Sequence, residues 1–505
     1  MLDATFVRMA SPVRRRPPRF VHALTRPNGG APPAALLVAV PAVALAIRAV
    51  VVVTSPPVLF YGSDNTWYDA TATSFATGHL GRLPGLFAPR VLSLKFPPGY
   101  PLVMAVGQRL LFWVQPFWAH LWTSVLLGSA GAVVVAVLAW RLADRADRPG
   151  RVVAAAVAGL VFAANPLVVG QSTSLMSEAL YVPLVALFLL GVDRAATDGR
   201  GGVWLYLAGL LAYLGITRPE VVVLLAVALV VPGARRRTSG DRRRVAGVLA
   251  SGLGLAVLWS VLASGAAHRV VFVSVNSGSV LLGANCPESW HGDLRGLWSV
   301  DCLSVPSTRL SPAANQALAQ KPFPIGLPPQ AGARIEAEIN AVQLHEALRA
   351  ITHQPGAAVG AVPFRWARAV GLFWDGGEAR LEYFEGKSPG WERAGRWLHE
   401  TVLLPLLLVA GAGLAWPRSR LGTALRQVVE PHRLLPGGML LVAWLVLVAL
   451  TEGSIRVRAP VEPVVAVLAG IGVAALGRAV RAGTALPSTP PPDPRPAAVQ
   501  TTGQA

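Results

Sequence analysis

Long apolar runs, most of them close to twenty residues, constrain this chain more than any other feature of its sequence. An α-helix of about 20 residues is long enough to cross the hydrocarbon core of a bilayer. Such runs are predicted at 34–54, 118–140, 152–170, 177–193, 203–232, 245–266, 401–416, 435–451 and 459–477. Only 14% of the residues are charged, against roughly a quarter in soluble domains. The pattern therefore predicts an integral membrane protein.

The basic side chains give the predicted helices a direction. They gather between the apolar runs, near residues 14, 141, 235 and 418, and the positive-inside rule assigns such clusters to the cytoplasm. The run at 203–232 lies between two cytoplasmic flanks, so it must cross twice, with a bend at 217–220 where Pro219 breaks the helix. We therefore predict an all-α polytopic fold of about ten transmembrane helices with both termini inside. The net charge of +19 is explained without a nucleic-acid partner.

This topology divides the chain into five parts. They are a basic cytoplasmic N-terminus at 1–33, a transmembrane core at 34–266 with an external loop at 55–117, an external segment at 267–400, C-terminal transmembrane helices at 401–483 and a disordered Pro-rich tail at 484–505. The loop is expected to form helices that lie at the membrane surface. The external segment is expected to be of mixed structure, with an amphipathic helix at 331–351. It has as many acidic as basic residues, which fits the translocated side.

The chain has two cysteines, Cys286 and Cys302, and both lie in the predicted external segment. Disulfides persist in oxidising compartments outside the cytoplasm, so this placement favours a bond between them. Two free buried thiols are the alternative. No CxxC motif or histidine cluster has the spacing of metal ligands, so the sequence predicts no certain cofactor and leaves a divalent metal requirement open.

Five motifs resemble, in their order along the chain, those of GT-C glycosyltransferases. They are SDNTWY at 63–68, FPPGYPLVMA at 96–105, SLMSEALYVPLVALFL at 174–189, GITRPEVVVLL at 215–225 and IRVRAPVEPVVAVLAG at 455–470. This superfamily includes the polyprenyl-phosphate-mannose-dependent protein mannosyltransferases of family 39 and the aminoarabinose transferases. The external segment with its two cysteines is similar to that of actinobacterial members. The resemblance implies an enzyme that takes a sugar from a polyprenyl-phosphate donor.

The resemblance also implies roles for particular residues. Asp64 is similar in place to the catalytic base that deprotonates an acceptor hydroxyl while the sugar carbon is inverted. The leaving polyprenyl phosphate needs cations at the same depth, and cationic side chains are predicted at the outer ends of helices or in outer loops. The residues with an implied binding role are Tyr68, Lys95, Glu178, Arg218, Glu220, Arg456 and Arg458.

The sequence departs from the family at one position. Many relatives have an Asp-Glu pair where this chain has Asp64 and Asn65. Either Glu178 or Asp69 could take the role of the missing acid. Asp64 itself could instead be a helix N-cap, a common place for aspartate.

The cationic candidates have structural alternatives as well. Lys95 could extend its ammonium group toward water at the membrane interface, and Arg218 could pair with Glu220 at the tip of the helical hairpin. Because Arg456 and Arg458 are two positions apart, they point to different sides of a helix. We therefore expect only one of them to reach the donor.

The predicted activity is transfer of a sugar, mannose or arabinose, on the outer face of the plasma membrane. The acceptor hydroxyl could belong to a protein, a polysaccharide or a lipid. The alternative is a transporter or flippase, which typically has repeated halves and ionisable residues at the bilayer midplane. Here the charged candidates lie at the outer surface, no repeat is visible, and Arg48, the clearest charge within a span, is expected to reach toward the interface. A catalytically inactive scaffold is a third possibility.

Overall fold

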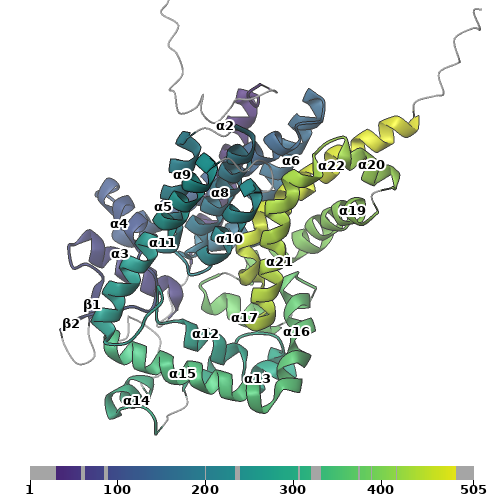
Figure 1. The fold of residues 1–505 in the computed structure, drawn as a ribbon. Helices are drawn as coiled ribbons and strands as arrows, with labels where there is room; N and C mark the ends of the chain where they lie inside the picture. The colour runs from purple at the N-terminus through teal and green to yellow at the C-terminus, as the bar shows by residue number, and fades with distance from the viewer. Residues whose placement is uncertain are drawn as a thin grey trace, which may run out of the picture.

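The protein is a bundle of long helices with a cap of shorter helices at one end (Figure 1). The computed structural model describes residues 30–57, 63–84, 89–198, 201–233, 239–304, 308–319, 331–372, 376–387, 389–416 and 418–484. Most of the predicted cytoplasmic N-terminus, the first residues of the basic cluster at 235 and nearly all of the predicted tail lie outside these described residues.

Six stretches of helix among the described residues are long and apolar enough to cross a membrane. They coincide with or overlap α2 (Ala34–Thr54), α5 (Pro116–Leu142), α8 (Glu178–Asp198), α11 (Ser239–Ala267), α21 (Leu435–Leu450) and α22 (Glu462–Thr484). The protein is therefore a multi-pass helical membrane protein, as the apolar runs predicted.

The predicted number of ten crossings is not confirmed. The run predicted as one helix at 152–170 is broken into α6 (Arg148–Ala164) and α7 (Pro166–Thr173), which meet at an angle of 50° and add a seventh span if they are counted together. Pro166 cannot continue α6, and the Asn165 side chain accepts the Leu167 N–H at 3.0 Å to start α7. The helices α9 (Gly201–Gly215), α10 (Val221–Gly233) and α19 (Leu404–Ala415) are shorter than 18 residues. The break between α9 and α10 falls at 216–220, where the bend was predicted.

Small residues let the central helices approach closely. A Cβ added to Gly470 of α22 would lie 2.2 Å from the Ala154 carbonyl of α6, so only glycine fits there. Arg48 of α2 does not reach toward the interface as expected. It is fully buried, and its Nε donates to Ser172 Oγ at 2.9 Å while Nη1 donates to the Ala163 carbonyl at 3.1 Å. These acceptors satisfy much of the guanidinium within the bundle.

The predicted external loop at 55–117 contains α3 (Asp64–Ala76), β1 (Arg82–Pro84), β2 (Arg90–Leu92) and α4 (Gly99–Leu110). The helix α3 was predicted from the sequence. The two strands form an antiparallel hairpin in which Leu83 faces Val91, so the fold is not purely helical. Strands of three residues are too short to show an alternating pattern in the sequence.

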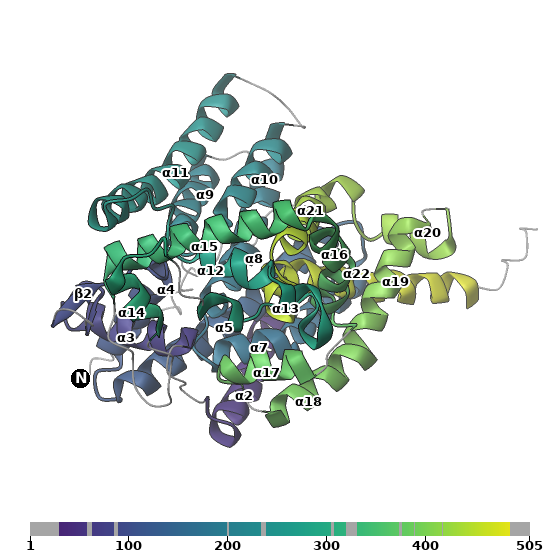
Figure 2. The same cartoon turned by 90° about the horizontal axis from the view of Figure 1, so that it is seen from below.

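The segment at 267–400 packs across one end of the bundle (Figure 2). Its described elements are α12 (Ser277–Ala284), α13 (Pro287–Trp290), η1 (Gly292–Leu294), η2 (Asp301–Ser304), α14 (Pro312–Ala319), α15 (Ala333–His353), α16 (Pro355–Ala369), α17 (Gly376–Phe384), α18 (Pro389–Leu398) and the start of η3 (His399–Leu403). The predicted amphipathic helix corresponds to α15. The remaining short elements are α20 (Arg420–Arg426), η4 (Pro431–Leu434) and η5 (Ile455–Val461).

Candidate functional site

Three charged residues that are far apart in the sequence meet at the end of the bundle that carries the 267–400 segment. Arg456 Nη1 donates to Asp64 Oδ2 at 2.8 Å, and Arg456 Nε donates to Glu178 Oε1 at 2.8 Å. Asp64 is the first residue of α3, and Glu178 is the first residue of α8. Acids are favoured at these positions by the helix dipole. Ser63, not Asp64, is the residue before the first turn of α3, so Asp64 is not the N-cap.

Arg218 and Glu220 extend this cluster from the turn between α9 and α10. Arg218 Nη1 lies 2.7 Å from Glu178 Oε1, and Arg218 Nε lies 3.3 Å from Glu220 Oε1. Arg218 therefore pairs with Glu220, as the structural alternative proposed, and binds Glu178 as well. The turn is held by Gly99, whose N–H donates to the Ile216 carbonyl at 2.8 Å. The two motifs FPPGYP and TRPE are thereby brought into contact.

A further group of charges, which was not predicted from the sequence, lies at the end of α17. Glu385 Oε1 accepts from Arg456 Nη1 at 2.8 Å, and Lys387 Nζ lies 2.8 Å from Glu382 Oε1 and 3.2 Å from Glu385 Oε2. Burial lowers the pKa of Lys387, but the two glutamates outweigh it and raise that pKa above its usual value. The signal in the sequence was a set of glutamates at 378, 382 and 385, spaced to share one helical face.

Lys95 reaches the same region but is bound differently. Its Nζ lies 4.7 Å from the ring centroid of Trp67 and 5.2 Å from that of Phe96. Among the described residues Lys95 forms no ion pair, whereas Arg218, Arg456 and Lys387 all do. Burial lowers the pKa of Lys95, and the carboxylates of Asp64 and Glu336 oppose that shift. Lys95 is thus a cation of this cluster that is available to an anionic ligand.

Tyr68 packs α3 against the start of α4. Its ring centroid lies 4.7 Å from that of Phe96 and 5.0 Å from that of Tyr100, and burial raises the pKa of its hydroxyl. The side chain is buried, so its evident role here is to hold the helix that carries Asp64.

Arg458 turns away from Asp64. It forms a buried ion pair with Glu462, and its Nη1 donates to the Val370 carbonyl at 3.2 Å. Glu462 also accepts a hydrogen bond from Asn165 at the break between α6 and α7. Of the two arginines, Arg456 alone joins the cluster, and Arg458 has a structural position within the bundle.

The two acids considered for the missing member of the Asp-Glu pair also separate. Glu178 shares Arg456 with Asp64, as described above. Asp69 instead pairs with His120, its Oδ1 lying 2.7 Å from His120 Nδ1, and His120 Nε2 lies 2.9 Å from Gln108 Oε1. Asp69 therefore links α3 to α4 and α5 rather than joining Arg456.

The 267–400 segment fixes the loop that carries Arg456. The Ile455 N–H donates to Glu378 Oε1 at 2.8 Å, and the Gly453 N–H donates to the Gly296 carbonyl at 2.7 Å. Arg365 Nη1 donates to a carbonyl in the last turn of α21 at 2.6 Å. A Cβ on Gly453 would lie 2.3 Å from the Arg365 carbonyl oxygen, so the approach requires glycine. The position of Arg456 thus depends on the packing of the 267–400 segment.

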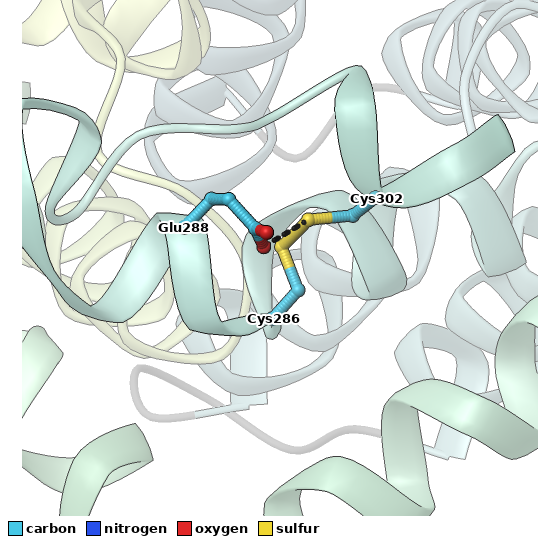
Figure 3. Close-up of side chains that lie close together, drawn as sticks. All are labelled: Cys286, Glu288 and Cys302. Atoms are coloured by element: carbon cyan, nitrogen blue, oxygen red, sulfur yellow. Dashed lines mark hydrogen bonds between the residues drawn. A yellow bond between two sulfur atoms is a disulfide. The ribbon is translucent and has the colours of Figure 1, made fainter. Parts of the chain in front are cut away.

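Cys286 and Cys302 are joined by a disulfide with an S–S distance of 1.99 Å. Glu288 lies beside the bond, with Oε2 2.9 Å from Cys302 Sγ (Figure 3). The potential metal-ligand atoms of these three side chains all lie within 4.8 Å of one another, and among the described residues this is the group that meets that criterion. Both sulfur atoms are used by the disulfide, so the group does not form a metal site.

The fold and the cluster together describe a multi-pass membrane protein with a charged site at one end of its helical bundle. No family of known proteins and no curated protein matches the sequence. The chain resembles two groups of solved structures. It is 17% identical to ArnT from Cupriavidus metallidurans bound to undecaprenyl phosphate, with a TM-score of 0.38, covering 88% of this chain and 78% of that one. It is 12% identical to the Archaeoglobus fulgidus oligosaccharyltransferase tethered to an acceptor peptide, with a TM-score of 0.45, covering 90% of this chain and 51% of that one. Likenesses at these scores carry no conclusion about the activity of this chain.

Proposed function

We propose that the protein is a glycosyltransferase that moves mannose or arabinose from a polyprenyl-phosphate donor to an acceptor hydroxyl. In this proposal the reaction takes place on the outer face of the plasma membrane, and the 267–400 segment lies outside. The observation that carries this proposal is the cluster itself. Asp64, Glu178, Arg218 and Arg456 were named from four separate motifs, and they lie within one network of hydrogen bonds.

Asp64 is the base in this proposal. Among the described residues its ion-pair partner is Arg456, which holds Oδ2 and leaves Oδ1 for an acceptor hydroxyl. Asp64 takes the proton of that hydroxyl as its oxygen forms a bond to the sugar C1 carbon. General base catalysis of this kind is typically worth about 10²–10⁴-fold in rate. Attack from the face opposite the phosphate inverts the configuration at C1.

Lys95 stabilises the leaving group. The bond between C1 and the phosphate oxygen breaks, and the polyprenyl phosphate departs with the electron pair. Its oxygen gains negative charge, which the Lys95 ammonium can meet because no protein carboxylate among the described residues occupies it. The rings of Trp67 and Phe96 hold that ammonium through cation–π contacts.

The remaining charges set the geometry of the base. Arg218 and Arg456 both bind Glu178, which is 1% exposed, so the two arginines are fixed on one buried carboxylate. Arg456 then presents its Nη1 to Asp64. Such a pre-arranged network costs no reorganisation during the reaction.

The positions of the charges favour this reaction over transport. Asp64 and Glu178 begin helices, Arg218 lies in a turn, and Arg456 lies just before α22. Transporters place such groups at the midplane.

The test follows radiolabelled polyprenyl-phosphate mannose and polyprenyl-phosphate arabinose in membranes that contain the wild-type protein, Asp64→Asn or Asp301→Asn. Asp301 is an exposed aspartate of the 267–400 segment and serves as the matched control. We expect the wild type and Asp301→Asn to consume one donor alike, and Asp64→Asn at equal protein level to be at least about 100-fold slower. Partition of the label among protein, polysaccharide and lipid then identifies the acceptor.

Equal turnover by Asp64→Asn would show that Asp64 is not the base. If the wild type consumes neither donor, the donor assignment is wrong, and uptake of lipid-linked substrate into vesicles becomes the measurement for the transport alternative.

A further inference from the structure

The turn at 93–95, which precedes α4 and carries Lys95, is fixed by the 267–400 segment. The Leu94 N–H donates to Glu336 Oε2 at 2.8 Å, and the Leu94 carbonyl accepts from the Val275 N–H at 2.9 Å. The Leu94 side chain is 1% exposed and packs among small apolar residues of α11 and α15. Both backbone groups and the side chain of Leu94 are therefore held by residues more than 150 positions away in the sequence.

Glu336 is the charged member of this contact. Its Oε2 also lies 3.4 Å from Ser93 Oγ, while its Oε1 is buried and has no hydrogen-bond partner among the described residues. Burial raises the pKa of Glu336 to about 7. The hydrogen bonds from Leu94 and Ser93 and the charge of Lys95 oppose this rise. Among the described residues Lys95 is the cation that acts on this carboxylate.

The start of α15 is built to deliver Glu336 to this turn. Gly332 precedes the helix with φ of +88°, a conformation that favours glycine, and its Cα faces Val91 of β2. Glu336 follows one turn later, where the β-hairpin lies beside the start of α15 (Figure 1). The helix thus reaches the strand and the turn from a single anchored point.

We propose that Glu336 is a positioning residue for Lys95. From α15 it fixes the backbone of the 93–95 turn and thereby the place of the Lys95 ammonium beside Trp67, one helical turn from Asp64. The claim that Lys95 binds the donor phosphate rests on the proposed function. The claim that Glu336 positions Lys95 is independent of it.

The chain allows a readout that does not depend on activity. It contains three lysines, at 95, 321 and 387, so an amine-reactive reagent and mass spectrometry can follow Lys95 with the other two as internal references. The variants are Glu336→Gln and, as matched control, Glu338→Gln. Glu338 lies two positions along α15 and accepts the Ser311 N–H at 2.6 Å and its hydroxyl at 3.0 Å. It therefore holds the start of α14 and does not contact the turn.

We expect Glu336→Gln to raise the labelling rate of Lys95 about threefold, because the amine loses a neighbouring negative charge that raises its pKa and gains mobility. Glu338→Gln should leave that rate unchanged. With turnover measured on the same samples, we expect the KM for the donor to rise about fivefold, because Lys95 also meets the phosphate charge of the bound donor. We expect kcat to fall as well, because the charge on the leaving oxygen grows in the transition state.

Unchanged Lys95 labelling in folded Glu336→Gln would overturn the inference, whether or not KM changes. Faster labelling together with a wild type that turns over neither donor would keep the positioning role and reject the proposed function. If Glu336→Gln does not fold, Ser93→Ala removes the weaker contact to Glu336, together with the hydrogen bond from the Lys95 N–H to Ser93 Oγ. It should raise Lys95 labelling by a smaller factor, and labelling equal to the wild type would again refute the role of Glu336.

Discussion

Replacing Arg456 by methionine tests whether the charge cluster holds the fold together as well as the site. Methionine is close in length and carries no charge. The substitution removes three charge-assisted hydrogen bonds, to Asp64, Glu178 and Glu385, each worth roughly 1.5–3 kcal/mol. Their sum overstates the loss, because Glu178 keeps Arg218 at 2.7 Å and Glu385 keeps Lys387 at 3.2 Å.

The net loss of stability depends on which carboxylates are left without an ion-pair partner. Asp64 alone loses its ion pair, and with a side-chain exposure of 24% it can be partly hydrated. We therefore expect a loss near the lower end of the range for breaking a buried pair, about 3 kcal/mol. In a chain of this length that corresponds to a fall in Tm of about 3 °C. Arg456→Lys keeps the charge but not the fork of donors, so it should recover about half of the loss.

The assay is thermal unfolding in one detergent, with donor turnover measured on the same preparations. Arg481→Met, an exposed arginine near the end of α22, is the control and should unfold as the wild type does. A Tm for Arg456→Met within about 1 °C of this control would refute the reasoning, because it would mean that the three carboxylates tolerate the loss of their shared cation. Turnover should fall about 100-fold or more if Arg456 fixes the base.

Three further outcomes follow from the structure. Arg458→Met should lower Tm at least as much as Arg456→Met does, because Arg458 and Glu462 are both nearly fully buried. The expected loss of stability is about 3–5 kcal/mol. A Tm equal to that of the wild type would contradict this. Gly453→Ala should reduce turnover more than about tenfold by displacing the Arg456 loop from Arg365, whereas Gly438→Ala, with open space around it, should not, and turnover alike in the two variants would count against it. Burial raises the pKa of Glu452 from 4.5 to about 7, so the native state binds this proton more tightly than the unfolded chain, and the stability it contributes is lost as pH rises from about 4.5 to 7. Glu452→Gln should flatten that fall in Tm by the equivalent of about 3 kcal/mol, and a slope as steep as in the wild type would assign the titration to other groups.

The apolar runs predicted the membrane helices because a helix in lipid needs apolar side chains along its length. The motifs, taken in their order along the chain, predicted four members of the cluster. The pairing of Glu385 and Lys387 with that cluster could not be read in the same way. They directly follow α17, and the contact of Glu385 with Arg456 depends on how the 267–400 segment packs on the bundle. Nothing in the local sequence encodes that contact.

Local geometry explains which of the two arginines joins the cluster and where one predicted helix breaks. Arg456 and Arg458 lie in η5, a 3₁₀ turn of three residues per turn rather than an α-helix, so their directions could not be assigned from an α-helical spacing. The break between α6 and α7 had a signal, the Asn165–Pro166 pair, which the apolar run around it outweighed.

The ion pair between Asp64 and Arg456 joins residues 392 positions apart. A ribosome that adds roughly 5–20 residues per second therefore makes the arginine about 20–80 s after the aspartate. During that interval α3 and α8 have reached the membrane with acids whose shared partner does not yet exist, and those acids must stay hydrated. The last two helices consequently complete the core of the protein rather than simply ending the chain. A nascent protein that stops before residue 455 would leave Asp64 without its ion-pair partner, while Glu178 would still have Arg218.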